Sequence, residues 1–283
     1  CCVVDDSELG ITHILRGDDH ISNTPKQILF YEAFGLVPPR FGHMPLILGP
    51  DGSKLSKRHG GVSVAEYKAE GFLPEALANY LIFLGWTPSD GREILGLAEA
   101  ARLFSIDRMN DVQAKFDLVK LKWMNGEYIM AKETAALVPL IQDQLRRDGY
   151  DFDVSDGARW AAVVDLYKIR IKTLRELGPM IEFFFREDFP VDEEGRKKHL
   201  GAPEKKALLA DLASRLEALP EFSAAGLEEL YRGLAAERNI KVAELIHPSR
   251  MAVSGLTKGA GLFEIMAVLG RGTVVDRLRR NSL

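Results

Sequence analysis

Strand-like sequence occurs only near the beginning of this chain, and that restriction limits what the chain can fold into. Short apolar segments bounded by Asp, Gly or Pro favour strands at residues 2–4, 11–15 and 43–48. A capping-box pattern follows at Ser63-Val64-Ala65-Glu66, and helical spacing of apolar residues then continues to the end. The sequence therefore predicts a mainly α-helical protein that begins with a small parallel α/β part.

The order strand, helix, strand predicts a parallel crossover unit in this first part. Asn23-Thr24-Pro25 supplies a cap and a proline in the first turn, and the following segment has helical spacing up to Gly35. Parallel strands need such a crossover, and three strands alone make a poor sheet. The first residue is Cys1 and not Met. We therefore expect the chain to be the carboxy-terminal part of a longer protein, with further strands upstream.

The helical part contains several predicted helices joined by irregular segments. Apolar residues lie on nearly every face of "LPEALANYLIFLG", which is typical of a buried helix. Helical spacing also covers residues 97–104, 117–130, 133–147, 155–187, 203–218, 224–238 and 262–280. The predicted linkers are residues 148–156, residues 189–203 and a bend at His247-Pro248.

The composition is that of a globular protein with a real core, since 46% of the residues are hydrophobic and 28% are charged. The net charge of −4 argues against a uniformly basic nucleic-acid binder, although local patches matter more than the total. Cys1 and Cys2 are adjacent, which excludes a disulfide framework or a zinc site and leads us to expect a cytoplasmic protein. No signal peptide, membrane span or metal-ligand spacing is visible.

The segment "GPDGSKLSKRHGG", residues 49–61, concentrates three cations between glycines. It follows the strand predicted at residues 43–48, and open parallel sheets bind ligands at the carboxyl ends of their strands. Lys54 and Lys57 are three residues apart, so in a tight turn both ammonium groups approach one polyanion such as a nucleoside triphosphate. A merely solvated basic turn explains the same composition, and the loop in isolation does not choose between the two.

A second polar group lies in "LRGDDHISNTP", residues 15–25. Arg16 ends a predicted strand and has the forked guanidinium that grips a carboxylate, while Asp19 can accept from a ribose hydroxyl or an ammonium group. Gly17 permits close approach of the backbone. A surface ion pair is the competing explanation for Arg16, Asp18 fits a turn equally well, and His20 alone is weak evidence for catalysis.

Three segments, in this order, resemble the bacterial glutamyl-tRNA synthetases, which are class I aminoacyl-tRNA synthetases. They are "VVDDSELGITHILRGDDHISNTPKQILFYEAFG", "FGHMPLILGPDGSKLSKRHGGVSVAEYKAEGFLPEALANYLIFLGW" and "FDLVKLKWMNGEYI". In this family "KLSKR" is the second class I signature, whereas the first signature, of the HIGH type, is absent from these residues. The resemblance implies a Rossmann-like catalytic part at 1–62, a helical stem at 63–130 and an all-helical anticodon-binding domain at 131–283, with two subdomains split near 190–203.

The resemblance also implies roles for individual residues. Arg16 would bind the carboxylate of glutamate, and Asp19 would contact ATP. The mobile ATP-binding loop would consist of Lys54, Leu55, Ser56, Lys57 and Arg58. Lys54 and Lys57 would be its catalytic cations. The pair Asp18-Asp19 departs from the Glu-Asp or Glu-Glu pair of many relatives, which leaves the role of Asp18 open.

By the same resemblance, the residues that would face the anticodon are Arg170, Arg250, Leu262 and Phe263. We expect Arg170 on a helix that buries Tyr167 and Ile171 and leaves the guanidinium at the edge of the apolar stripe. Exposed Arg and aromatic side chains suit the unstacked bases of an RNA loop. Core packing competes as the explanation for Leu262 and Phe263, and a local ion pair competes for Arg250.

The resemblance therefore implies a glutamate–tRNA ligase, which activates glutamate with ATP and Mg²⁺ and transfers it to tRNA(Glu). We expect no protein-bound zinc, no membrane partner and a monomer. The chain as given would be inactive alone, and an isolated tRNA-binding fragment is the main alternative. The related enzyme that glutamylates a modified tRNA base is disfavoured because it lacks an anticodon domain. A generic nucleotide-dependent ligase would have no use for the tRNA-facing residues.

Overall fold

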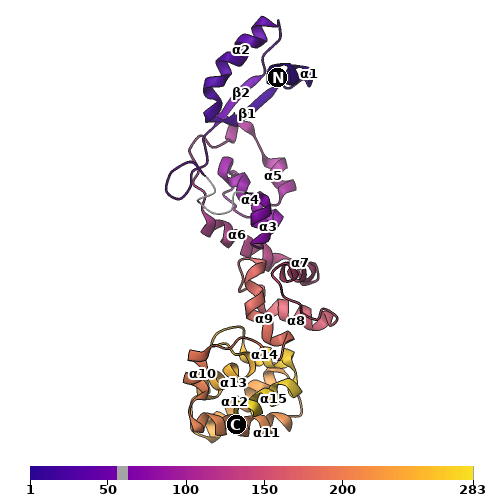
Figure 1. Cartoon of the computed structure of the whole chain (residues 1–283), viewed down its shortest axis with the longest axis vertical. Coiled ribbons are helices and arrows are strands. Elements are labelled where there is room, and N and C mark those ends of the chain that lie inside the picture. The colour runs from indigo at the N-terminus through magenta and orange to yellow at the C-terminus, as the bar shows by residue number, and fades with distance from the viewer. Residues whose placement is uncertain (56–62, 283) are drawn as a thin grey trace. The chain divides into compact units, whose positions relative to one another are not determined.

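The computed structural model describes residues 1–55 and 63–282. The chain divides into two compact units, Cys1–Tyr128 and Ile129–Leu283, and each is described separately (Figure 1). Among the described residues, helices predominate and one two-stranded sheet occurs, in the first unit. This agrees with the predicted fold class. None of the helices described at 1–55 and 63–282 is long and apolar enough to cross a membrane.

A parallel crossover opens the first unit, as the sequence predicts. β1 (His13–Gly17) pairs in parallel with β2 (Arg40–Met44), and the connection contains the 3₁₀ helix η1 (Asp18–Asn23) and α2 (Thr24–Ala33). A Cβ at Gly42 of β2 would lie 2.5 Å from Leu15 Cδ2, so a larger residue there would displace the Leu15 side chain. Gly17 and Met44 are paired in the register, so both strands end at the same edge of the sheet.

Two predictions about strands are wrong. Residues 2–4 belong to a helix, α1 (Cys2–Glu8). Short apolar runs do not separate strands from helices, and in α1 Val3 is buried while Val4 is 41% exposed. The strand predicted at residues 43–48 begins earlier, at Arg40, and ends at Met44. Pro45 follows, and a proline has no N–H with which to continue a ladder.

The remainder of the first unit is helical. α3 (Val64–Ala69) begins with the predicted capping box: Ser63 Oγ accepts from the Glu66 amide at 3.2 Å, and Glu66 Oε2 accepts from the Ser63 amide at 3.1 Å. α4 (Pro74–Gly85), α5 (Leu97–Leu103), the 3₁₀ helix η3 (Ile106–Arg108) and α6 (Leu118–Ala131) follow. One hydrophobic core cluster here consists of Phe72, Leu77, Tyr80, Phe116, Leu121 and Met124.

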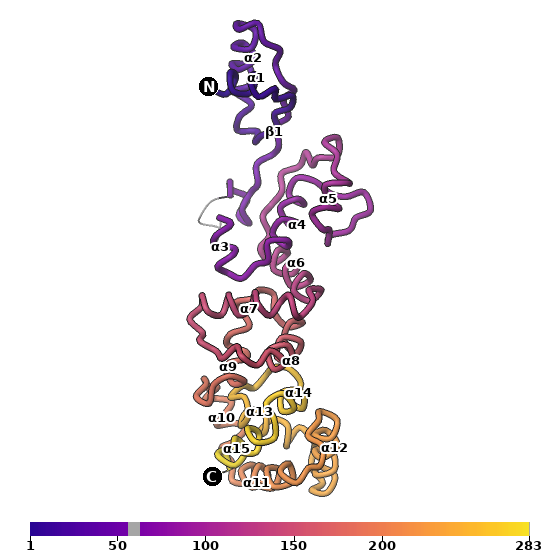
Figure 2. The backbone as a smooth tube through the Cα atoms, turned by 90° about the vertical axis from the view of Figure 1, so that its right-hand side faces the viewer, coloured from indigo at the N-terminus to yellow at the C-terminus, as the bar shows by residue number. Residues whose placement is uncertain are grey.

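The second unit is built from helices throughout its described part. They are α7 (Thr134–Arg147), α8 (Gly157–Tyr167), the 3₁₀ helix η4 (Leu174–Leu177), α9 (Gly178–Phe185), α10 (Glu193–Leu200), α11 (Pro203–Glu217), α12 (Ala224–Glu237), α13 (Ala243–Ser254), α14 (Leu262–Leu269) and α15 (Arg271–Ser282). α11 and α15 pack against each other (Figures 1 and 2). Leu209, Leu212 and Leu278 of these two helices are fully buried.

Four boundaries in the second unit differ from the predictions. The run at 155–187 divides into α8, η4 and α9, and the run at 262–280 divides at Gly270, whose φ of 82° ends α14. The predicted linker 189–203 contains α10. The predicted bend at His247-Pro248 lies inside α13. A proline removes a helical hydrogen bond, but the helix persists because it buries apolar residues such as Leu245 and Met251.

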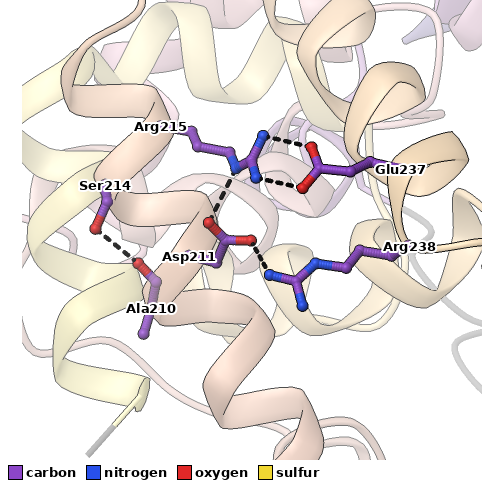
Figure 3. A network of polar contacts seen from close by, with 6 residues as sticks. All are labelled: Ala210, Asp211, Ser214, Arg215, Glu237 and Arg238. Carbon is purple, nitrogen blue, oxygen red and sulfur yellow. Dashed lines mark hydrogen bonds and ion pairs between the residues drawn. The ribbon is translucent and has the colours of Figure 1, made fainter.

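A polar network joins α11 to α12 (Figure 3). Asp211 accepts from Arg215 Nε at 2.9 Å and from Arg238 Nη2 at 2.8 Å. Arg215 also donates to both carboxylate oxygens of Glu237, at 2.9 and 2.8 Å. Such a two-pronged pair fixes geometry more firmly than a single contact, although partial exposure limits what it adds to stability. The network therefore links α11 to the carboxyl end of α12.

Candidate functional site

A tight turn places Lys54 beyond the carboxyl end of β2. Leu48 and Lys54 form an antiparallel bridge across it. Asp51 stabilises the turn by accepting from both the amide and the hydroxyl of Ser53, each at 2.9 Å. The turn predicted after residue 48 is therefore present, and it holds the first cation of the loop in a defined position.

Asp19 meets this cation. It lies in η1, directly after β1, and its Oδ2 lies 3.1 Å from Lys54 Nζ. The hydrogen bond from Lys54 lowers the pKa of the Asp19 carboxyl. A Cβ at Gly17 would lie 2.5 Å from Asp19 Oδ1, so a glycine is needed here for the carboxylate to occupy this position. Two residues that the sequence singled out separately are thus brought together, with both side chains open to solvent.

Arg16 is held by its own chain. Its Nη2 donates to Thr24 Oγ1 at 2.7 Å, and Thr24 Oγ1 is also 2.9 Å from His43 Nε2. The guanidinium lies 5.3 Å from the centre of the Phe41 ring. Its buried Nε has no hydrogen-bond partner among the described residues. Among the described residues Arg16 makes no ion pair, so the competing explanation of a surface ion pair is not supported.

Thr24 and His43 are site residues that the sequence did not single out. Thr24 was visible only as part of a helix cap, and His43 only as the start of a predicted strand. Both line a hollow of about 520 Å³, together with Ile21, Pro25, Ile28 and Leu29. Because most of this lining is apolar, the hollow suits an apolar group better than an anion.

Of the remaining residues in the predicted ATP-binding loop, only Leu55 is among the described residues. Leu55 is partly buried and packs against the core cluster of the first unit. Ser56, Lys57 and Arg58 lie outside the described residues. Asp18 is the first residue of η1.

In the second unit, Arg170 and Arg250 lie near each other and near Tyr167. Arg170 is exposed and follows the end of α8, so it lies in a turn, and the prediction that it lies on a helix is wrong. Tyr167 and Ile171 are each 1% exposed, as the apolar spacing predicts. Arg250 is half-buried on α13, and burial lowers the pKa of its guanidinium, with further influence from the charges of Tyr167 and Arg170.

Two polar atoms of this group lack a hydrogen bond of full geometry among the described residues: the Tyr167 hydroxyl and Arg250 Nη1. Both border Gly259, because a Cβ built there would lie 3.4 Å from each. Burial raises the pKa of Tyr167, and the neighbouring Ala260 amide opposes that change. A buried donor without a partner is costly, so an acceptor supplied by a ligand would be stabilised here. The glycines of "TKGAGLF" are the one local signal that the sequence offers for this arrangement.

Leu262 and Phe263 both begin α14 but differ in exposure. Leu262 is 3% exposed, which favours core packing for its side chain. Phe263 is half-buried, and its ring meets that of Tyr231 edge-on with the centroids 5.1 Å apart. Of the two, Phe263 has side-chain surface that a ligand can touch.

Two family models match the chain. Residues 1–123 match the catalytic domain of class I tRNA synthetases (E and Q), and residues 133–281 match an anticodon binding domain. Within the described residues, no group of three His, Cys, Asp or Glu side chains could hold a metal ion.

Individual relatives agree with these models. A glutamate–tRNA ligase of Syntrophomonas wolfei is 43% identical over 282 residues, which are 98% of this chain and 56% of that protein. A glutamate–tRNA ligase of Moorella thermoacetica is 43% identical over 288 residues, 98% of this chain and 57% of that protein. The crystal structure of a glutamate tRNA ligase from Elizabethkingia meningosepticum, in complex with its amino acid, has a TM-score of 0.88 at 29% identity, covering 99% of this chain and 58% of that one. The chain thus spans little more than half the length of these relatives. It belongs to the glutamate–tRNA ligase family of class I aminoacyl-tRNA synthetases, of whose members it matches the carboxy-terminal part.

Proposed function

We propose that this chain is the part of a glutamate–tRNA ligase that carries the second signature loop and binds the anticodon. The complete enzyme would activate glutamate with ATP to glutamyl-adenylate and then transfer glutamate to the terminal ribose of tRNA(Glu). The observation that carries the proposal is the Asp19–Lys54 pair. These residues are 35 positions apart and meet where two parallel strands end, which is where open α/β sheets bind nucleotides.

The proposed activation needs positioning and charge stabilisation but no protein nucleophile. A carboxylate oxygen of glutamate would attack the α-phosphate of ATP, the bond to pyrophosphate would break, and negative charge would build on the phosphate oxygens. Lys54 and Lys57 would stabilise this charge. Lys54 would exchange its exposed partner Asp19 for a phosphate oxygen, and Asp19 would then accept from a ribose hydroxyl.

The other loop residues and Arg16 would complete the substrate site. Leu55, Ser56 and Arg58 would close over ATP together with the two lysines. Arg16, whose Nη2 is engaged by Thr24, would use its remaining donors for the glutamate carboxylate. Mg²⁺ would be bound through the phosphates of ATP, since the described residues offer no group of three metal ligands.

The second unit would read the anticodon of tRNA(Glu). Arg170 is exposed, and its guanidinium has only donors, so it fits the acceptor edge of C and opposes the N1–H of G at the third anticodon position. Arg250 would supply a second donor through Nη1, which lacks a partner among the described residues. Phe263 would contact a base with its exposed part, and the buried Leu262 would support it from the core.

The proposal extends to domains and setting. We place the catalytic part at 1–62, the stem at 63–130 and the anticodon-binding domain at 131–283, with subdomains split near 190–203. The gap between the two family models, at residues 124–132, supports the boundary near 130. The protein would act as a cytoplasmic monomer on glutamate, ATP and tRNA(Glu), without a membrane partner.

The test is a binding experiment with this chain. Dissociation constants are measured for tRNA(Glu) and for a variant tRNA with G at the third anticodon position. We expect the wild type to prefer C, and Arg170→Gln to reduce that preference by ~1–3 kcal/mol, because Gln both donates and accepts.

The matched control is Arg146→Gln. Arg146 is an exposed arginine on α7 whose ion pair with Asp143 is long, at 3.9 Å, so this variant should bind both RNAs as the wild type does. A wild type without preference for C would contradict the proposed anticodon reading. An intact preference in Arg170→Gln would remove Arg170 from it.

A further inference from the structure

A polar hollow of about 320 Å³ lies among α10, α11 and the end of α15 in the second unit. Its lining consists of Glu193, Arg196, Lys197, Leu200, Gly201, Lys206, Arg280 and Asn281. Four of these side chains are cations and one is an acid. Neither the family resemblance nor the anticodon group of Arg170 and Arg250 uses any of them.

The cations of this hollow differ in how they are neutralised. Arg280 pairs with Glu187 at 3.0 Å, and Arg196 has a longer contact with Glu193 at 3.8 Å. Lys197 and Lys206 have no ion pair within residues 1–55 and 63–282. The hollow therefore has an excess of positive charge that the folded chain does not balance, and a concave surface concentrates such a field.

Local helix stability accounts for only one of these two lysines. Lys197 is in the last turn of α10, where a cation interacts favourably with the carbonyl end of the helix. Lys206 is the fourth residue of α11, near the amide end, where a cation is unfavourable. The positive end of α11 and the lysine beside it both favour an anion in the hollow.

The kind of anion follows from the rest of the lining. Stacking of a nucleobase needs an aromatic face, and none of the eight lining residues is aromatic. Lysine and arginine heads without a stacking surface suit phosphate groups whose bases lie elsewhere, as along an RNA backbone.

We propose that this hollow binds sugar-phosphate backbone of the tRNA, as a site separate from the base-reading group around Arg170. The inference rests on the proposed function, in that it requires tRNA to be the partner of the second unit. Lys197 and Lys206 each neutralise a phosphate, so they contribute to affinity and to its salt dependence but not to the choice of base.

The experiment measures the affinity of the chain for tRNA(Glu) at a series of KCl concentrations. Lys197→Gln/Lys206→Gln should reduce the magnitude of the slope of log K against log[KCl] by about 1.4–1.8, since each phosphate contact contributes about 0.7–0.9. The control, Arg232→Gln/Lys241→Gln, removes the same charge from α12 and from the segment before α13. Its slope should fall less. Lys197→Arg/Lys206→Arg should keep the wild-type slope, because arginine neutralises phosphate as well as lysine does.

The outcomes separate this inference from the proposed function. If the lysine variant keeps the wild-type slope, or loses no more than the control, the hollow does not bind RNA. If the slope of the lysine variant falls but its preference for C at the third anticodon position is lost too, the hollow is not separate from base reading and the inference is wrong.

If calorimetry detects lysine-dependent binding of inorganic phosphate while the RNA slope is unchanged, the site takes a small anion instead. A wild type that binds no tRNA overturns the proposed function and this inference together. Circular dichroism melting of each variant confirms that the fold is intact.

Discussion

The two units bury their apolar side chains to different extents. The second unit encloses long buried stretches of α8, α11, α13 and α14, and Leu212, Tyr231 and Met266 there have no exposed surface. In the first unit, large apolar side chains of α2 and its surroundings are open to solvent: Leu29 is 63% exposed, Phe34 58% and Val37 90%. Helices arranged around one core cover each other, whereas a two-stranded sheet with the short helices α1, η1 and α2 offers little surface against which to bury an apolar face.

This difference indicates which side chains stabilise each unit and which charged side chains can change partners. In the second unit, buried side chains such as Leu212 and Met266 stabilise the described helices, so loss of a single exposed charge should cost the fold little. In the first unit, the Asp19–Lys54 pair lies beside the thin sheet, where few buried contacts oppose its rearrangement. The following predictions test this comparison.

The largest effect is expected from a leucine truncation in the second unit. Leu212→Ala on α11 removes a side chain with 0% exposure and should lower the free energy of unfolding by about 2–5 kcal/mol, because a cavity remains. Leu29→Ala on α2 removes the same atoms from a side chain that is 63% exposed and should change it by less than about 0.5 kcal/mol. Urea unfolding followed by circular dichroism measures both. Equal losses would contradict the difference in burial.

A smaller effect is expected from a buried amide in the helical part of the first unit. Asn79 is 2% exposed, and its Oδ1 accepts from the Leu95 amide at 2.9 Å and from the Tyr128 hydroxyl at 2.8 Å. Asn79→Ala leaves the buried Leu95 amide without this acceptor, whereas the half-buried Tyr128 hydroxyl keeps the Leu95 carbonyl at 3.1 Å. The change should cost about 1–3 kcal/mol.

The matched variant for Asn79 is Asn23→Ala. Asn23 precedes α2, and its side chain does not make the capping hydrogen bond that the sequence predicts. Its contact with His20 Nδ1, at 3.1 Å, is exposed, so Asn23 should tolerate the change. Urea unfolding compares the two variants. If they lose the same stability, the helical part is no better ordered by its polar contacts than the α/β part.

The smallest effect is a pH dependence in the second unit. His199 on α10 stacks on His247 with ring centroids 5.2 Å apart, and burial, followed by the charges of His247, Lys198 and Lys205, lowers its pKa, while Asp192 opposes the change. The unfolded chain therefore takes up the proton at a higher pH than the folded chain. Stability from this group is present above the unfolded pKa of 6.5 and is lost as the pH falls below it.

His199→Gln cannot take up this proton, so the fall in unfolding midpoint between pH 8 and pH 5 should be shallower than in the wild type. Urea unfolding at each pH measures the fall, and Trp160, buried in the second unit, provides a local fluorescence signal. An identical pH profile in the variant would show that His199 is not the group responsible.

Features that depend on residues close together in the sequence could be predicted. The capping box at Ser63 and Glu66, the crossover between β1 and β2 and the left-handed glycine that follows α2 each depend on a few adjacent residues. The choice of Lys54 and Asp19 as candidates also came from local patterns, at a strand end and in a glycine-rich loop. These features were predictable because the atoms that stabilise them are close in sequence as well as in space.

The sequence by itself determined the mainly helical class, the position of the crossover and most helix starts, because capping residues and apolar spacing act over one or two turns. Only the tertiary structure decided that residues 2–4 are helical and that Pro248 stays inside α13, since each depends on which surface is available to bury the side chains. It also decided that Asp19 meets Lys54 across 35 residues and that Tyr167 and Arg250 border Gly259. Contacts between distant residues depend on how whole elements pack, and no local pattern in one chain specifies that packing.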